Sequence, residues 1–144
     1  MEVLIRQIEI EDAESIASLS GQFSYPSTPE ETKDRIIKLR TYPNNCGFVA
    51  IQKNKIIGWV HVFLAVHLES SPFFEIGGLV VDENFRGQGV GKLLVEAVKT
   101  WCINKGNYKL RVRCNVIRTR THKFYKKLGF NETKESKIFE INLK

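Results

Sequence analysis

The segment Leu79-Val80-Val81-Asp82-Glu83-Asn84-Phe85-Arg86-Gly87-Gln88-Gly89-Val90-Gly91 joins an apolar run to three alternating glycines. Residues 79–81 end a predicted strand over residues 73–82, and apolar spacing of i, i+3, i+4, i+7 and i+8 from Val90 predicts a helix that stops at Gly106. Glycines allow a sharp turn and let several N–H groups face one point, beside the positive end of the helix dipole. The turn therefore favours an anion, and a phosphate above all.

Two common phosphate-binding motifs do not fit this turn. The dinucleotide pattern G-x-G-x-x-G requires glycine where Lys92 or Leu94 stands. The nucleoside triphosphate pattern G-x-x-x-x-G-K-[ST] requires glycine at Arg86 and a hydroxyl at Leu93. The pattern that remains is R-x-x-G-x-G after an apolar strand.

In this pattern the chain resembles the GNAT superfamily of acyl-CoA N-acyltransferases. The resemblance implies acetyl-CoA as cosubstrate and no metal, with the coenzyme pyrophosphate on the turn and the pantetheine arm along the strand. The residues expected to bind it are Leu79, Val80, Val81, Arg86, Gly87, Gln88, Gly89, Val90, Gly91 and Lys92. The competing interpretation is that the glycines serve only tight packing between strand and helix.

A second segment, residues 118–130, resembles the second cofactor motif of the family through Phe124-Tyr125 and the closing Gly129-Phe130. The resemblance implies that Tyr125 protonates the departing thiolate, a role for which a positioned phenol suffices. The alternative is that Tyr125 is a core aromatic residue.

The second motif departs from its commonest form. Arg118 and Thr121 stand where many members have asparagine and alanine, and the variant resembles the small-amine and aminoalkylphosphonate acetyltransferases of the superfamily. We expect Asn115 to hydrogen-bond the pantetheine arm and Arg118 to contact a coenzyme phosphate, with ordinary loop contacts as the alternative for both. His122 is left outside the catalytic set.

The attacking amine must lose a proton before it becomes nucleophilic. Glu75 is the first candidate for the base, because it stands in an apolar strand where burial would raise its pKa. The alternative is a strand-edge carboxylate that faces solvent or pairs with a nearby lysine. His61 and His67, in or just after a neighbouring strand, are further candidates.

The remaining pattern predicts a mixed α/β fold. A helix begins near Glu11 and ends at Gly21, and a second begins at Thr28-Pro29 with Glu31 completing a capping box. Gly77-Gly78 predicts a β-bulge or a close backbone approach. Strands are predicted over residues 3–8, 47–52, 56–66, 109–114 and 138–143, and a helix over 118–128. We expect one GNAT domain over residues 1–144, with a central sheet of six to seven strands flanked by about four helices.

Composition limits the class of protein. The chain has 144 residues, 42% of them hydrophobic, a net charge of +6 and three cysteines without metal-ligand spacing. Neither a signal peptide nor an apolar run of membrane length is evident, so we expect a cytoplasmic protein with reduced thiols and no membrane partner.

The resemblance implies direct transfer of an acetyl group to an amine, which we expect to be a small molecule. Two other functions stay open: an acyl-CoA sensor without turnover, and a nucleic-acid-binding module that uses the lysines and arginines of residues 105–127. Because no nucleic-acid-binding motif accompanies these cations, we expect no nucleic-acid partner. A homodimer is an open alternative. We expect residues 22–27 and 64–72 to shape the acceptor pocket, because specificity lies in such loops, but neither the acceptor nor the acyl chain is specified by the sequence.

Overall fold

The computed structural model describes residues 2–23, 25–107, 109–114 and 118–143. The chain forms two compact units, Met1–Arg113 and Cys114–Lys144. The first unit contains a mixed sheet and three α-helices, and the second contains one α-helix followed by a segment without regular structure.

The sheet of the first unit has five strands in the order of the sequence. Neighbouring strands are antiparallel, except for the last pair, which is parallel. The mixed sheet is therefore confirmed, with five strands among the described residues in place of the expected six or seven. The strands are β1 (Leu4–Gln7), β2 (Asn45–Gln52), β3 (Lys55–His67), β4 (Ser70–Val81) and β5 (Leu110–Val112).

Local sequence sets the register of the central strands. The β2–β3 turn has positive φ at both Lys53 (48°) and Asn54 (63°), which is the backbone that a two-residue type I′ hairpin requires. Between β3 and β4, His61 lies opposite Gly78 and Val62 opposite Ile76, so Gly77 is an extra residue. This is the bulge that the glycine pair predicts.

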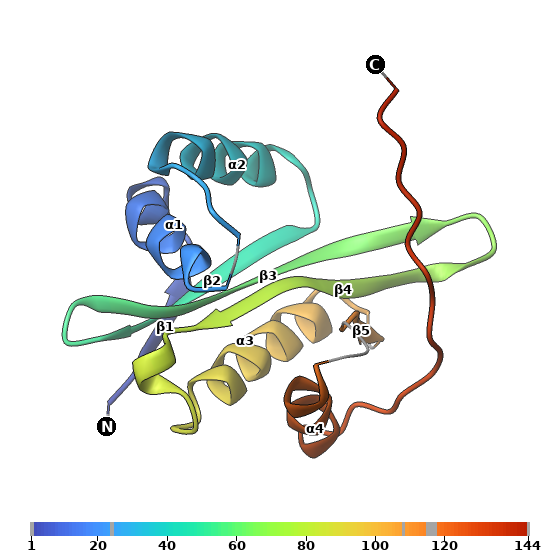
Figure 1. The fold of residues 1–144 in the computed structure, drawn as a ribbon. Coiled ribbons are helices and arrows are strands. Elements are labelled where there is room, and N and C mark those ends of the chain that lie inside the picture. The colour runs from blue at the N-terminus through green and yellow to red at the C-terminus, as the bar shows by residue number, and fades with distance from the viewer. Residues whose placement is uncertain (1, 24, 108, 115–117, 144) are drawn as a thin grey trace. The chain divides into compact units, whose positions relative to one another are not determined.

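Helices cover both faces of this sheet (Figure 1). Helices α1 (Ala13–Gly21) and α2 (Pro29–Thr41) bury Ile16 and Ile36 against Val49 of β2, with Trp59 of β3 packed beside them. Helix α3 (Val90–Asn104) lies on the opposite face, where Leu94 and Val90 approach Gly58 of β3. This helix connects the parallel strands β4 and β5, as the predicted βαβ unit requires.

Two local motifs fix the starts of the first helices. Thr28 and Glu31 form the predicted capping box, since the Glu31 amide donates to Thr28 Oγ1 at 3.0 Å and the Thr28 amide to Glu31 Oε1 at 2.8 Å. Before α1, a short 3-10 helix η1 (Ile10–Asp12) contains the buried Asp12, which accepts two hydrogen bonds of 2.8 Å from Arg6. Burial alone would raise the pKa of Asp12, but hydrogen bonds from Arg6 and from the Glu9 amide outweigh it and lower that pKa.

The second unit contains α4 (Thr119–Lys127), which ends before Gly129 with φ 98°. The prediction of a last strand over residues 138–143 is wrong, because these residues form no strand in the described chain and Phe139 is 89% exposed. Alternating apolar side chains define the face that a strand would bury, but a strand forms only where a partner supplies its hydrogen bonds.

In the described ranges no helix is both long and apolar enough to cross a membrane.

Candidate active site

One edge of β4 is open along its second half. Strand β5 pairs only with Phe74, Glu75 and Ile76, so residues 77–81 have β3 on one side and no described strand on the other. An extended ligand can hydrogen-bond to such an edge as a further strand would. Residues 79–81, predicted to hold the pantetheine arm, lie along this open edge.

The glycine turn follows directly from the end of this strand. Buried Asp82 accepts a hydrogen bond of 3.0 Å from the Asn84 amide and caps the short 3-10 helix η2 (Glu83–Phe85). Gly87 (φ 75°) and Gly89 (φ 85°) then adopt the left-handed backbone that disfavours other residues. Gly89 is the N-cap of α3, and no side chain caps the helix there. The first amides of α3 are therefore available to an anion at an exposed turn.

Two cations accompany this turn. The Arg86 guanidinium lies 4.4 Å from the centre of the Phe23 ring, which orients it, and Lys92 is an exposed residue in the first turn of α3. The Glu83 amide donates to Gln22 Oε1 at 3.1 Å. Thus Gln22 and Phe23, at the start of the segment expected to shape the acceptor pocket, both contact the turn region.

Glu75 is a buried carboxylate on β4, and its side chain is 12% exposed. Arg113 donates a hydrogen bond from Nε to Glu75 Oε1 at 3.4 Å. Glu75 is thus ion-paired, as the alternative interpretation expects. Its partner is Arg113, which follows β5, and not a lysine. The arginine holds the carboxylate in one place and leaves a small part of it accessible.

His61 lies over the bulge of β4. Its Nε2 atom is 3.2 Å from Asn45 Oδ1, its ring stacks on Phe63 with centroids 5.7 Å apart, and burial lowers its pKa. A Cβ atom at Gly77 would lie 2.8 Å from His61 Nδ1, so only glycine leaves room for the ring. His61 is therefore a neutral imidazole at pH 7 beside the point where β4 separates from β5. His67, the other strand histidine, stacks on Phe73 instead.

Tyr125 lies in the second unit, where it is buried. Its ring makes edge contacts with Phe124 and Phe130, at centroid distances of 5.0 and 5.4 Å. Burial and the nearby Cys114 thiol raise the pKa of the phenol well above its usual value of 10. The hydroxyl therefore keeps its proton through the physiological range, as a proton donor must.

Arg118 and Asn115 are the remaining candidates for binding the coenzyme. Arg118 is the exposed N-cap of α4, and its side chain makes no capping hydrogen bond at the start of the helix. Asn115 lies outside the described residues. No group of three or more metal-ligating side chains occurs in the parts of the chain that the structure describes.

Sequence reasoning missed the cations that β5 and its flanks place beside Glu75. Lys109, Arg111 and Arg113 alternate with other residues, so a strand puts all three on one face. The Arg111 guanidinium lies 4.1 Å and the Lys109 ammonium 5.6 Å from the centre of the buried Phe73 ring. The alternation was visible in the sequence, but the register that sets Arg111 opposite Glu75 was not.

Comparison with known proteins agrees with this geometry. The model of the acetyltransferase (GNAT) family matches residues 10–130. The chain is 37% identical over 65 residues to an aminoglycoside N(6')-acetyltransferase type 1 of Salmonella typhimurium, a match that covers 45% of each protein. It is 28% identical over 136 residues to a glucosamine 6-phosphate N-acetyltransferase of Arabidopsis thaliana, covering 88% of this chain and 89% of the relative.

A solved aminoglycoside N-acetyltransferase in complex with CoA has the same fold, with a TM-score of 0.86 at 24% identity over 97% of this chain and 95% of that chain. Because the family model matches residues 10–130, the chain belongs to the GNAT acetyltransferase family. The matched region spans less than half of the Salmonella relative, so family membership does not by itself transfer that protein's substrate.

Proposed function

We propose that this chain is an N-acetyltransferase that moves the acetyl group of acetyl-CoA directly to an amine on a small molecule. The observation that carries the proposal is that two features lie next to each other. The open edge of β4 over residues 77–81 leads directly into the glycine turn, and α3, which follows the turn, has Gly89 as its N-cap and no side-chain cap. The first feature suits an extended pantetheine arm, and the second suits a pyrophosphate.

Each residue of the turn has a definite part in this proposal. Gly87 and Gly89 turn the backbone so that the first amides of α3 donate to the pyrophosphate, while Arg86 and Lys92 supply full positive charge. Residues 79–81 hydrogen-bond the pantetheine arm, and Arg118 meets a coenzyme phosphate. Asn115 lies outside the described residues, and its proposed role, as inferred from the sequence, is to hydrogen-bond the pantetheine arm.

The reaction needs one proton removed and one proton supplied. The amine nitrogen forms a bond to the thioester carbonyl carbon, and the bond from that carbon to sulfur breaks. Tyr125 donates its phenolic proton to the leaving thiolate, and its raised pKa keeps that proton in place until it is needed. The phenolate then recovers a proton from solvent.

Glu75 is proposed as the base that takes the proton from the amine. It is a buried carboxylate that Arg113 holds on β4, two residues before the open edge begins at Gly77. His61 remains the second candidate, because its Nδ1 atom faces Gly77 at the bulge and burial keeps the ring neutral. Glu75→Gln and His61→Gln variants separate the two, since only loss of the true base lowers kcat by about a hundredfold.

An acyl-CoA sensor is the alternative function, and turnover decides between the two. The experiment follows CoA thiol release from acetyl-CoA over polyamines, aminoglycosides, aminoalkylphosphonates, amino acids and peptides. Amine-dependent release that Tyr125→Phe slows, with CoA affinity unchanged, supports the enzyme. Binding of CoA without release for any amine supports the sensor.

A further inference from the structure

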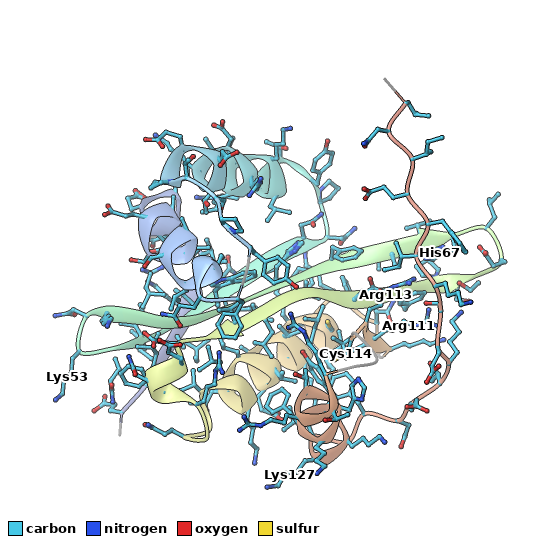
Figure 2. The ribbon with its side chains drawn as sticks, viewed as in Figure 1. Lys53, His67, Arg111, Arg113, Cys114 and Lys127 are labelled. Carbon is cyan, nitrogen blue, oxygen red and sulfur yellow. The ribbon has the colours of Figure 1, made fainter. Side chains whose placement is uncertain are left out.

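Three cations form a row on one face of the sheet edge, and we refer to Lys109, Arg111 and Arg113 as the cationic row. Arg111 and Lys109 both lie over the Phe73 ring, and Arg113 pairs with Glu75. Phe73 and Glu75 are two residues apart on β4, so they point to the same face. The three cations therefore share that face. Figure 2 labels Arg111 and Arg113 toward the end of the sheet where β3 turns into β4.

Positive charge exceeds negative charge along this row. Within the described ranges, Glu75 is the carboxylate that lies within 4.0 Å of the row, and it is paired with Arg113. No described carboxylate lies that close to Arg111 or Lys109. A guanidinium stacked on an aromatic ring uses its face, and its N–H donors lie in its plane. The Arg111 guanidinium lies over the Phe73 ring, and no described carboxylate within 4.0 Å occupies its N–H donors, which can therefore bind an oxyanion.

The row adjoins the open edge of β4 through direct contacts. Glu75 lies opposite Phe63, and Phe63 stacks on His61. Both of these rings lie over Gly77, where a Cβ atom would be 3.2 Å from Phe63 Cε1 and 2.8 Å from His61 Nδ1. Glu75 and Gly78 are separated by roughly 10 Å of strand. A small metabolite can span that distance.

The row does not belong to the turn proposed for the pyrophosphate. The turn follows Val81, at the far end of β4, and Glu75 lies roughly 20 Å of strand away from that end. The segments expected to shape the acceptor pocket supply little opposing charge: residues 22–27 contain none, and residues 64–72 contain one carboxylate, the exposed Glu69. A polycationic acceptor would meet like charge beside Glu75.

We propose that the acceptor amine carries an anionic group, a carboxylate, phosphonate or phosphate, which Arg111 binds with the help of Lys109 and Arg113. This inference rests on the proposed acetyl transfer and names the class of its acceptor. The amine lies between the Glu75 carboxylate and the bulge at Gly77, where either proposed base can reach it, and the anionic group lies over β5. The site selects against acceptors that carry only positive charges.

The test compares acceptors that differ in the anionic group alone. Initial rates of CoA release give kcat/KM for aminoethylphosphonate against ethanolamine and for glucosamine 6-phosphate against glucosamine, with kanamycin as a polycation. We expect at least one anionic amine to exceed its neutral partner by about tenfold or more, the effect of one charge-assisted contact. Arg111→Gln removes that advantage by raising KM for the anionic amine toward the value for its neutral partner.

Two further variants make the result specific. Arg35→Gln removes an exposed cation from α2 and serves as the matched control, since it should leave the preference intact. Lys109→Gln tests the row at an exposed position and keeps the proposal testable if Arg111→Gln, at a half-buried position, loosens the packing on Phe73. Thermal unfolding of each variant verifies that it is folded.

The outcomes separate this inference from the proposed function. Release of CoA with kanamycin or the neutral amines, at rates equal to or above those with the anionic amines, overturns the anionic acceptor and keeps the acetyltransferase. Absence of release with every amine counts against the acetyltransferase. Calorimetric titration of the CoA complex with both anionic amines then decides the site: binding that Arg111→Gln abolishes supports it, and absence of binding overturns it.

Discussion

The guanidinium of Arg113 lies 3.4 Å from the carboxylate of Glu75, which stands on β4 two residues before the free edge begins at Gly77. This contact joins the two halves of the proposed chemistry. Glu75 is held where it can take a proton from the amine, and Arg113 belongs to the row proposed to bind the anionic part of the same acceptor. The roles of Glu75 and Arg113 can therefore be tested separately by substituting each residue.

Glu75→Gln should lower kcat by about a hundredfold, because an amide of the same shape cannot accept the amine proton. Its CoA affinity should match the wild type, since the turn is at the other end of β4. Steady-state rates with one fixed acceptor give kcat, and calorimetry gives the affinity for CoA. Glu69→Gln, which removes a carboxylate 83% exposed in the adjoining β3–β4 turn, is the control. Unchanged kcat in Glu75→Gln would remove Glu75 from the mechanism.

Gly89→Ala should weaken CoA binding at least tenfold, because alanine at φ 85° strains the backbone whose amides cap the phosphate. The chain offers a matched control at the other end of the same helix. Gly106 has φ 84°, and like Gly89 it has no atom within 4 Å of the added Cβ. Both substitutions should cost about 1–2 kcal/mol of folding stability. Equal CoA affinities for the two variants would show that the turn does not bind the coenzyme.

Tyr125→Phe should slow turnover by about a hundredfold without changing CoA affinity, because only the proton donor is lost. The pH dependence has a defined sign. Burial raises the pKa of the phenol, so its protonated form persists above pH 10 and the wild-type rate should not fall between pH 7 and 10 because of this group. Phe124→Leu, which removes an adjacent ring and no hydroxyl, controls for packing. A Tyr125→Phe variant as fast as Phe124→Leu or faster would assign Tyr125 to the core alone.

Arg6→Met should reduce the free energy of unfolding by about 1–3 kcal/mol at pH 7, because buried Asp12 loses two hydrogen bonds from a guanidinium. The pKa of Asp12 is lowered in the folded protein, so its contribution is present above its ordinary value of 3.8 and is lost as the pH falls below it. Urea unfolding at pH 7 and near pH 2.5 should therefore show a difference that shrinks in acid. Arg40→Met, an exposed change on α2, should cost less than about 0.5 kcal/mol. A penalty independent of pH would contradict the pairing.

Most of the fold follows from local patterns in the sequence. The capping box at Thr28, the positive-φ turn at Lys53-Asn54 and the bulge at Gly77 are each encoded within a few residues, and the structure contains all three. Strand pairing between distant segments is not encoded so locally. The sequence therefore could not indicate that Arg111 lies opposite Glu75, nor that the alternating residues 138–143 would lack a partner strand.

The candidate site likewise has one part that the sequence predicts and one part that it does not. Glycine spacing identifies the turn, since it depends on backbone conformations that few other residues adopt. The acceptor side depends on which side chains meet across three strands, as Asn45, Phe63 and Glu75 do. No pattern in one stretch of sequence reveals such a meeting, because each of the three residues is ordinary in its own strand.

The most direct test of the central claim is the stoichiometry of acetyl transfer. Purified protein is incubated with acetyl-CoA and each amine of the panel, and released CoA thiol is measured alongside the acetylated amine by mass spectrometry. Acetyl transfer predicts one acetylated amine for each CoA released, with a rate that Gly89→Ala lowers and Gly106→Ala does not. Tight binding of acetyl-CoA with neither product, for every amine, would contradict it.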